Sequence, residues 1–362
     1  MMKPVPLLIV SVVSLIILFS FFSENEVVDE PVQEITQQTK AQNDSGFEFS
    51  ESSKKDPLLN NKGIQQSFRG VAKSYAAQSR FPASSMPIQD EASLQKYIPN
   101  QAVGASLPYE GPNGEAWRFG LRTDQFRYFK GEEIKIFVTL TGDNNQLDSD
   151  VTIAVVADRK VIHEVGRGSL SAGYFQASID TDAVNTSSWP KELHIQAIAE
   201  LDGEYMQVLE TIRFEESVAE VEGVGKGSVD NEYLVIPVEL DTDARGYFRV
   251  TAVLFSQSSN KPLVHLEGKS KITVNNDTVE LKAHIDALRV SGDEGPYEIQ
   301  HLYVEKMPGP PDYASAFGKT NDQVYPVSAQ SFDSYADADY ENPSAQRSLE
   351  FLNKMGGNQT QN

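Results

Sequence analysis

The sequence predicts an all-β protein whose folded part is two successive β-sandwich modules, residues 107–216 and 217–306. Short segments alternate apolar and polar residues; in Glu133 to Leu140 the side chains that share one face are Ile134, Ile136, Val138 and Leu140, the pattern of a half-buried strand. Turn-forming residues such as Gly142 to Asn145 separate these segments at regular intervals, as in an antiparallel sandwich. Amphipathic segments of helix length are nearly missing between them, which disfavours a βαβ architecture.

Further strand-like segments continue this pattern through both modules. In the first module they are Val151–Ala157, Lys160–Val165, Gly173–Ile179, Glu192–Ala199 and Glu204–Phe214. In the second module they are Tyr233–Leu240, Gly246–Phe255, Pro262–Thr273, Thr278–Ile285 and Pro296–Val304. The glycine-rich stretch Gly223–Ser228 lies before the second set and is interpreted as a hinge.

Two sequence patterns resemble a known family. The pattern Y-x-x-G-E-x-I-x-I at Tyr128 to Ile136, with the strand start Gly173-Tyr174-Phe175, resembles immunoglobulin-like domains of bacterial envelope proteins. The second module is similar to immunoglobulin-like repeats of bacterial surface and secreted proteins, from Gly246-Tyr247-Phe248 to Gly295-Pro296-Tyr297. The resemblance implies tandem immunoglobulin-like sandwiches and brings no catalytic residues with it.

The N-terminal residues 1–23 predict a transmembrane signal-anchor. Pro4 to Phe22 carries no charge and is rich in Leu, Ile, Val and Phe, and about 19 residues of helix just cross the hydrocarbon core of a bilayer. Lys3 lies before this segment and acidic residues follow it. The positive-inside rule then places the N-terminus in the cytoplasm and the rest outside, in the periplasm. The alternative is a cleaved signal peptide and a secreted protein.

The segments that flank the two modules lack strand periodicity. Residues 24–106 are rich in Gln, Ser, Glu, Asp, Asn and Pro and predict a disordered linker, with short helices near Gly63–Gln78 or Glu91–Tyr97 as the alternative. Residues 307–362 predict an irregular tail in which aromatic residues recur. Its aromatic rings either pack back across a sandwich or anchor a partner, and Ala345–Lys354 is expected to form a short helix.

Charge and cysteine content exclude several classes of protein. The formal net charge is −21, with 52 acidic and 31 basic residues. This excess argues against a nucleic-acid partner and against adsorption to anionic lipid, since both require clustered Lys and Arg. The chain has no cysteine, which excludes disulfides, thiolate metal sites and lipobox lipidation.

Motifs that carry catalysis do not occur in the sequence. The five histidines form no H-x-x-x-H spacing, and His194 and His284 are expected on the polar faces of strands. Ser169 to Gly173 lacks the first glycine of G-x-S-x-G. The glycines from 223 to 227 lack the spacing of a phosphate-binding loop. We therefore expect no catalytic residues, no cofactor and no enzymatic activity.

Calcium is the one metal ion for which the sequence offers candidate ligands. Asp241 and Asp243 alternate before Gly246, and Asp143, Asp148 and Asp150 fall in one loop region. Hard cations of this kind take six to eight oxygen ligands. Asp, Asn and Gly are also what ordinary β-turns require, so both interpretations stay open.

Together these observations predict a non-enzymatic, membrane-anchored envelope protein whose tandem modules bind or scaffold in the periplasm or at the cell surface. The expected partner is an envelope protein or polysaccharide, with the membrane contacted through the N-terminal helix. One alternative is a polysaccharide-acting hydrolase or its accessory subunit. Another is a calcium-stabilised adhesin.

Overall fold

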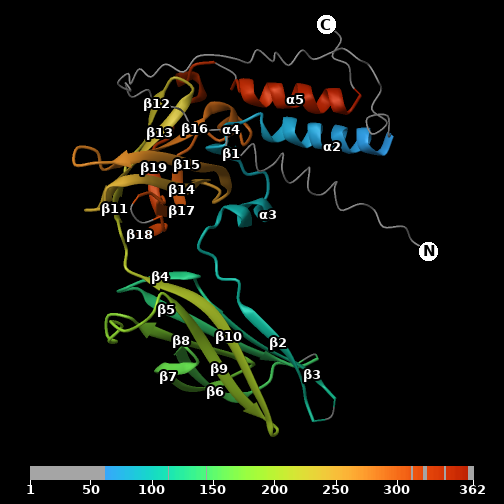
Figure 1. Ribbon diagram of the computed structural model, residues 1–362, viewed down its shortest axis with the longest axis vertical. Coiled ribbons are helices and arrows are strands. Elements are labelled where there is room, and N and C mark those ends of the chain that lie inside the picture. The colour runs from blue at the N-terminus through green and yellow to red at the C-terminus, as the bar shows by residue number, and fades with distance from the viewer. Residues whose placement is uncertain are drawn as a thin grey trace, which may run out of the picture. The chain divides into compact units, whose positions relative to one another are not determined.

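The computed structural model describes residues 62–357 except 113, 144, 311–312, 321–323 and 338–339. These residues are predominantly β, with sandwich-like sheets (Figure 1). The predicted signal-anchor and residues 24–61 of the predicted linker lie outside the described residues. Within the described ranges, no helix combines the length and the hydropathy that a membrane crossing requires.

The first module contains nine strands in two sheets. In chain order they are β2 (Ala105–Glu110), β3 (Ala116–Thr123), β4 (Arg127–Phe129), β5 (Glu133–Thr141), β6 (Ser149–Ala157), β7 (Lys160–Leu170), β8 (Tyr174–Asp180), β9 (Glu192–Leu201) and β10 (Glu204–Glu215). A four-stranded sheet has the order β2-β3-β5-β8, and a five-stranded sheet has the order β4-β10-β9-β6-β7. All pairs are antiparallel except β4 with β10, which is parallel.

One hydrophobic core lies between these two sheets. The alternation predicted for Glu133 to Leu140 is confirmed, because the four apolar side chains that share a face in β5 are all fully buried. They pack with Trp117 and Phe119 from β3 and with Ile195 and Val208 from the opposite sheet. Burial of this alternate set is what holds the register of each strand.

The second module is built on a ten-stranded sheet. Its strands are β1 (Ser85–Pro87), β11 (Glu220–Val224), β12 (Ser228–Asp230), β13 (Tyr233–Asp241), β14 (Gly246–Ser256), β15 (Pro262–Ile272), β16 (Thr278–His284), β17 (Tyr297–Lys306), β18 (Ala316–Thr320) and β19 (Val324–Val327), with the short helix α4 (Ile285–Arg289) after β16. The main path is β1-β15-β14-β17-β18-β11-β13-β12; β16 pairs with β13, and β19 pairs with β17.

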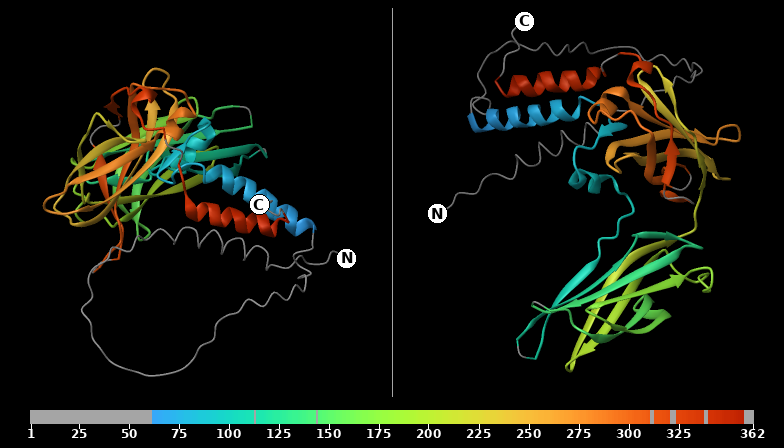
Figure 2. Two further views of the ribbon diagram at one scale, coloured as in Figure 1. Left: turned by 90° about the horizontal axis from the view of Figure 1, so that it is seen from above. Right: turned by 180° about the vertical axis from the view of Figure 1, so that it is seen from behind.

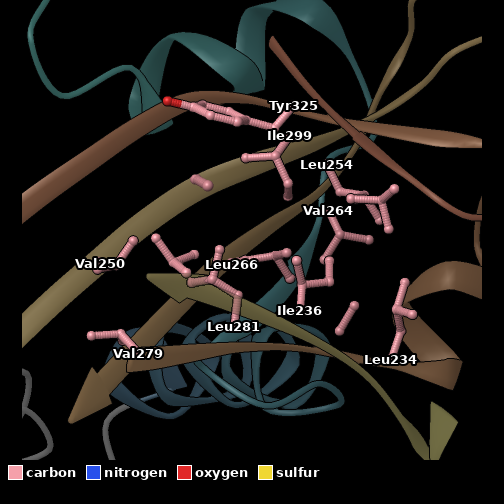
Figure 3. Close-up of a cluster of buried hydrophobic side chains, with 14 of the residues drawn as sticks. Leu234, Ile236, Val250, Leu254, Val264, Leu266, Val279, Leu281, Ile299 and Tyr325 are labelled. Carbon is pink, nitrogen blue, oxygen red and sulfur yellow. The ribbon is translucent and has the colours of Figure 1, made fainter. Parts of the chain in front are cut away.

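The core of the second module is formed by side chains from most of these strands, namely β11, β13, β14, β15, β16, β17 and β19. Figure 3 shows apolar side chains that gather between the strands, among them Leu234, Ile236, Val264 and Leu281. Strands β15 and β16 approach closely at Gly268, where an added Cβ would lie 2.2 Å from the carbonyl oxygen of Glu280. Glycine is therefore the residue that lets these two strands pack at this distance.

Residues 62–106 are folded where a disordered linker was predicted, and the short helices expected as the alternative near Gly63–Gln78 and Glu91–Tyr97 are confirmed. This part of the chain forms α2 (Lys62–Gln78), β1, α3 (Glu91–Leu94) and the 3-10 turn η1 (Gln95–Tyr97). Strand β1 pairs with β15 at the edge of the second module. Phe81 is buried in the main core of that module, and Ile88 and Leu94 are buried with Val253 and Phe255 of β14. The apolar residues here are too few for a local period, and their partners lie far along the chain.

The prediction of an irregular tail over residues 307–362 is also wrong in part. Strands β18 and β19 pair with β17, and the short 3-10 helix η2 (Phe332–Ser334) follows. Tyr325 and Tyr335 are buried in the second core, so these rings pack back onto the sandwich. The expected helix over Ala345–Lys354 is confirmed by α5 (Pro343–Met355).

Helices α2 and α5 lie side by side although they come from opposite ends of the described chain (Figure 2). The guanidinium Nε of Arg69 donates a hydrogen bond to the carbonyl oxygen of Gly356 at 2.7 Å. Ala72 and Leu352 are buried where the helices meet. Asn342 begins α5, because its side chain accepts a hydrogen bond from the N–H of Ala345 and so caps the helix.

Candidate functional site

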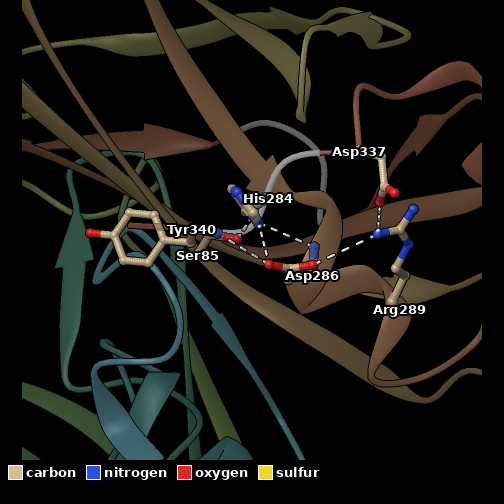
Figure 4. A network of polar contacts seen from close by, with 6 residues as sticks. All are labelled: Ser85, His284, Asp286, Arg289, Asp337 and Tyr340. Carbon is tan, nitrogen blue, oxygen red and sulfur yellow. Dashed lines mark hydrogen bonds and ion pairs between the residues drawn. The ribbon is translucent and has the colours of Figure 1, made fainter. Parts of the chain in front are cut away.

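A polar cluster in the second module joins three distant chain segments (Figure 4). The backbone N–H of His284 donates to Oγ of Ser85 on β1 at 2.8 Å. The backbone N–H of Asp286 donates to Nδ1 of His284 at 3.1 Å. Nη1 of Arg289 lies 3.2 Å from Oδ1 of Asp337 in the C-terminal segment and 3.8 Å from Oδ1 of Asp286. This cluster ties the N-terminal and C-terminal segments to α4.

The hydrogen bonds of Ser85, His284 and Asp286 differ from those of a serine hydrolase. In a serine hydrolase the imidazole accepts the proton of an exposed serine hydroxyl. Here Oγ of Ser85 accepts from a backbone N–H, and Nδ1 of His284 caps α4. Ser85 is fully buried and His284 is 1% exposed. The expectation that His284 lies on the polar face of a strand is therefore wrong: it ends β16 with its ring inside, between the rings of Tyr233 and Tyr340.

The structure places the calcium candidates in two separate modules. In the first module, Oδ1 of Asp148 accepts the N–H of Ala172 at 2.8 Å, and Oδ1 of Asp150 accepts the hydroxyl of Ser169 at 2.6 Å. Asp143 lies in the loop after β5. Both carboxylates thus accept hydrogen bonds from the end of β7 and the turn after it, and Asp150 does so from within β6.

The other two candidates lie in the second module. Asp241 ends β13 and Asp243 lies in the turn that follows. Across the described ranges, no group of three or more acidic or histidine side chains comes together as metal ligands. Calcium stays a prediction of the sequence.

The outer face of the four-stranded sheet carries aromatic and basic side chains in cross-strand register. Arg122 of β3 is paired with Phe137 of β5, and Phe137 is paired with Gln176 of β8. The guanidinium carbon of Arg122 lies 4.5 Å from the centre of the Phe137 ring. The ring of Tyr174, 45% exposed, lies 6.5 Å from that of Phe137, and its hydroxyl lies 3.3 Å from Oε1 of Gln176. We call these four residues the aromatic-cationic face.

Basic residues also surround this face. Arg118 and Lys135 are exposed on the same side of β3 and β5, because their inward neighbours Phe119 and Ile134 are buried. Arg122 is exposed, and its guanidinium makes a cation–π contact with the Phe137 ring. The same outer side also carries the exposed acidic pair Glu133 and Asp180, at one end of β5 and β8.

Only one residue of this face departs from the pattern of its own strand. Phe137 interrupts the polar side of its strand, since it is an aromatic residue at a position where alternation predicts a polar one. Arg122 does not stand out in the sequence, and Tyr174 is marked only as part of the strand start Gly173-Tyr174-Phe175. They join Phe137 only because β3, β5 and β8 are neighbours in the sheet, and strand order is not encoded in local periodicity.

Glu210 of β10 is a buried carboxylate in the first module. It is 7% exposed; Oε1 accepts the N–H of Gly104 at 3.0 Å, whereas Oε2 has no hydrogen-bond partner among the described residues. Burial raises the pKa of the Glu210 carboxyl, and interactions with Gly104, Thr123 and Arg122 oppose this rise only in part. Ionisation of Glu210 therefore costs free energy in the folded state.

A pH dependence of stability follows from the raised pKa of Glu210. The contribution of Glu210 to the free energy of unfolding is fully present below the unfolded-state pKa of its carboxyl. It is lost as the pH rises through the higher folded-state pKa. We expect Glu210→Gln to raise the unfolding temperature at pH 7.5 and to change it little at pH 4, as measured by circular dichroism. The exposed Glu204→Gln on the same strand is the control. Equal shifts at both pH values would contradict the prediction.

Comparisons with known proteins return only partial similarities. No protein-family model and no curated protein matches the sequence. Among solved structures, a DUF4785 family protein from Legionella pneumophila is 16% identical with a TM-score of 0.37, and the match covers 52% of each chain. The chain thus spans about half the length of that protein.

Two further structural matches cover smaller shares of longer proteins. Escherichia coli alpha-2-macroglobulin activated by porcine elastase is 10% identical with a TM-score of 0.24, covering 63% of this chain and 24% of that one. A calcium-binding mutant of Bacteroides uniformis beta-glucuronidase 2 is 11% identical with a TM-score of 0.24, covering 45% and 28%. At TM-scores below 0.5 none of these likenesses carries a functional argument.

Proposed function

We propose that the chain is a non-enzymatic, membrane-anchored envelope protein whose first module binds an acidic polysaccharide. The anchor is the uncharged segment Pro4 to Phe22, and the two modules are tandem immunoglobulin-like sandwiches. The parallel pairing of β4 with β10 beside antiparallel β9 and β6 supports this architecture for the first module. The observation that carries the binding proposal is the aromatic-cationic face.

The chemistry of this face matches a sugar that bears carboxylates. The exposed ring of Tyr174 offers a flat apolar surface with a polar edge, which suits the face of a pyranose ring. Arg122 offers N–H groups in the planar geometry that pairs with a carboxylate through two hydrogen bonds. Gln176 adds an amide beside the Tyr174 hydroxyl. Extended polymers lie along open sheet faces, so a deep pocket is not required.

The test is titration of the full chain with polygalacturonate, alginate and neutral dextran, followed by isothermal calorimetry. We expect binding to the two acidic polymers and none to dextran. Tyr174→Ala and Arg122→Gln are each expected to weaken binding about tenfold, equivalent to roughly 1.4 kcal/mol for a contact at the centre of the surface.

The matched control is Tyr205→Ala, since Tyr205 is 60% exposed on β10 of the opposite sheet. It is expected to bind as the unaltered chain does. Failure of all acidic polymers to bind, or equal affinity of the Tyr174 and Tyr205 variants, would refute the proposal. If the same face instead binds an acidic protein segment, and Tyr174→Ala and Arg122→Gln both abolish that binding, the partner is a protein and the polysaccharide proposal is refuted.

A further inference from the structure

Among the described strands of the first module, β8 is the edge strand that lacks protection against pairing. The two sheets of this module end in β2, β8, β4 and β7. Strand β2 contains Pro108, β4 has three residues, and β7 has two register shifts against β6. These are features by which natural sheets prevent edge-to-edge association. Strand β8 has seven residues, contains no Lys, Arg or Pro, and pairs with β5 in an unbroken register.

The outer edge of β8 has main-chain groups that are open to a further strand. The N–H of Leu140 in β5 donates to the carbonyl of Gly173 at 2.9 Å, and in an antiparallel ladder every second residue bonds to the same neighbour. The residues that bond to β5 are therefore the odd-numbered ones from 173 to 179. Gln176 and Ser178 direct their N–H and carbonyl groups the other way, where no described strand pairs with β8.

Turns close this open stretch at both ends. The N–H of Tyr174 donates to the carbonyl of Ser171 at 3.2 Å, and the carbonyl of Tyr174 accepts the N–H of Ser171 at 3.1 Å. At the other end the carbonyl of Asp180 accepts the N–H of Ala183 at 3.2 Å. The open edge is therefore centred on Ala177.

The inward side chains of β8 are also incompletely covered. Phe175 and Ala177 pack against the core of the first module but remain partly exposed, whereas the inward side chains of β5 are fully buried. The ring of Phe175 lies against Gly168 of β7, where an added Cβ would be 2.1 Å from it. A strand added to β8 would therefore bury apolar surface as well as pair main-chain groups.

We propose that the chain forms a two-fold dimer in which β8 pairs antiparallel with β8 of a second copy. A two-fold axis at Ala177 places Gln176 opposite Ser178 of the second copy, and symmetry repeats this pair. Each pair exchanges two main-chain hydrogen bonds. Such an interface uses the same surface of both copies, as in most symmetric dimers.

The sequence of β8 is self-complementary in this register. Ala177 faces Ala177 of the second copy, and a small residue fits a non-hydrogen-bonded pair, where Cα atoms approach to about 4.5 Å. Phe175 lies opposite Ile179 of the second copy, an aromatic and β-branched pair of the kind that stabilises sheets. Asp180 lies opposite Tyr174, so the two carboxylates of Asp180 do not face each other. A second copy thus supplies the alternation of apolar and polar side chains that this edge accepts.

The acidic composition of the chain does not oppose this contact strongly. The net charge is −21, but Asp180 is the single charged residue of β8. Charges farther apart than the Debye length of about 10 Å are largely screened. The local chemistry of the edge therefore decides whether two copies pair.

The dimer would place both aromatic-cationic faces on the same side of one continuous sheet. Residues that lie opposite each other in an antiparallel ladder point to the same side, and the two Tyr174 positions are then roughly 20 Å apart along the strands. A long acidic polymer would contact both faces and gain avidity. This last step rests on the proposed polysaccharide binding, whereas the dimer itself does not.

A single introduced cysteine tests the register, because the chain has no cysteine of its own. In the full chain, solubilised in detergent, Ala177→Cys is expected to form a disulfide-linked dimer on mild oxidation, since the Cα separation of a non-hydrogen-bonded pair suits a disulfide. Ala105→Cys is the matched control, because Ala105 is also a partly buried alanine and lies on β2, at the opposite edge of the same sheet. Non-reducing electrophoresis is expected to show a dimer for the first variant only. No dimer for Ala177→Cys, or equal amounts for both variants, would overturn the proposal.

Sedimentation equilibrium of the same solubilised chain tests the hydrogen bonds. Ser178→Pro removes an N–H that points away from β5, so the first module keeps its own ladder. This variant is expected to weaken the dimer about thirtyfold, because one hydrogen bond is lost in each of the two symmetric pairs. Ser178→Ala keeps the N–H and is expected to dimerise as the unaltered chain does, with circular dichroism as the check on folding.

Two sedimentation results would contradict the dimer. One is an unaltered chain that stays monomeric at all concentrations, and the other is a dimer that is equally stable in Ser178→Pro and Ser178→Ala. If Ser178→Pro does not fold, the pair of cysteine variants still decides. Neither measurement contains a polysaccharide, so failure of the dimer is distinguished from failure of the proposed binding.

Discussion

Replacing Phe248 by alanine is expected to lower the free energy of unfolding of the second module by about 3–5 kcal/mol. Phe248 is fully buried in the core of that module. It lies on β14, which pairs with β15 on one side and β17 on the other. Its neighbours are therefore held on both sides by strand pairing, and they relax little into the cavity that the substitution leaves.

The neighbouring residue provides the control for this prediction. Tyr247 is 57% exposed on the opposite face of the same strand, so Tyr247→Ala is expected to change stability by no more than about 0.5 kcal/mol. Differential scanning calorimetry of both variants, with each module's transition assigned by limited proteolysis, measures the difference. Similar losses in the two variants would contradict the assignment of Phe248 to the core.

Replacing Arg127 by alanine is expected to destabilise the first module by about 3–5 kcal/mol. The guanidinium of Arg127 on β4 forms an ion pair with the carboxylate of Glu215 on β10. The two side chains are only 11% and 12% exposed. Without Arg127 the carboxylate remains buried and unpaired, and its desolvation is no longer offset. We expect urea unfolding of the first module to report this loss.

A second ion pair, which also involves a residue of β10, tests the role of burial. Arg213 and Glu192 lie 3.2 Å apart with side chains 39% and 52% exposed, so Arg213→Ala is expected to cost about 0–1 kcal/mol. The double variant Arg127→Met with Glu215→Leu is expected to be more stable than Arg127→Ala, because it removes both charges. The opposite order would show that the charge of Glu215 is not the source of the cost.

The sequence by itself determined the β architecture, because strand formation here leaves a local signal. In β5 and β14 every second side chain is apolar, and those side chains are buried. The expected turns separate strands whose bounds lie close to the predicted ones. Helix α5 was also predictable, since an apolar face at helical spacing is contained within its own residues.

The candidate binding face was predictable only in part. Phe137 departs from alternation within its own strand, so one strand is enough to mark it. Arg122 and Tyr174 fit their strands without any irregularity. Their proximity to Phe137 depends on which strands are neighbours in the sheet.

Only the tertiary structure decided where the N-terminal segment of the described chain packs. Strand β1 has three residues and no periodicity, yet it completes the edge of the second sheet beside β15. Ser85 is buried because its hydroxyl accepts the backbone N–H of His284, which is distant in sequence. A segment this short gains little from its own residues, and its order comes from hydrogen bonds and burial that only the assembled sheet supplies.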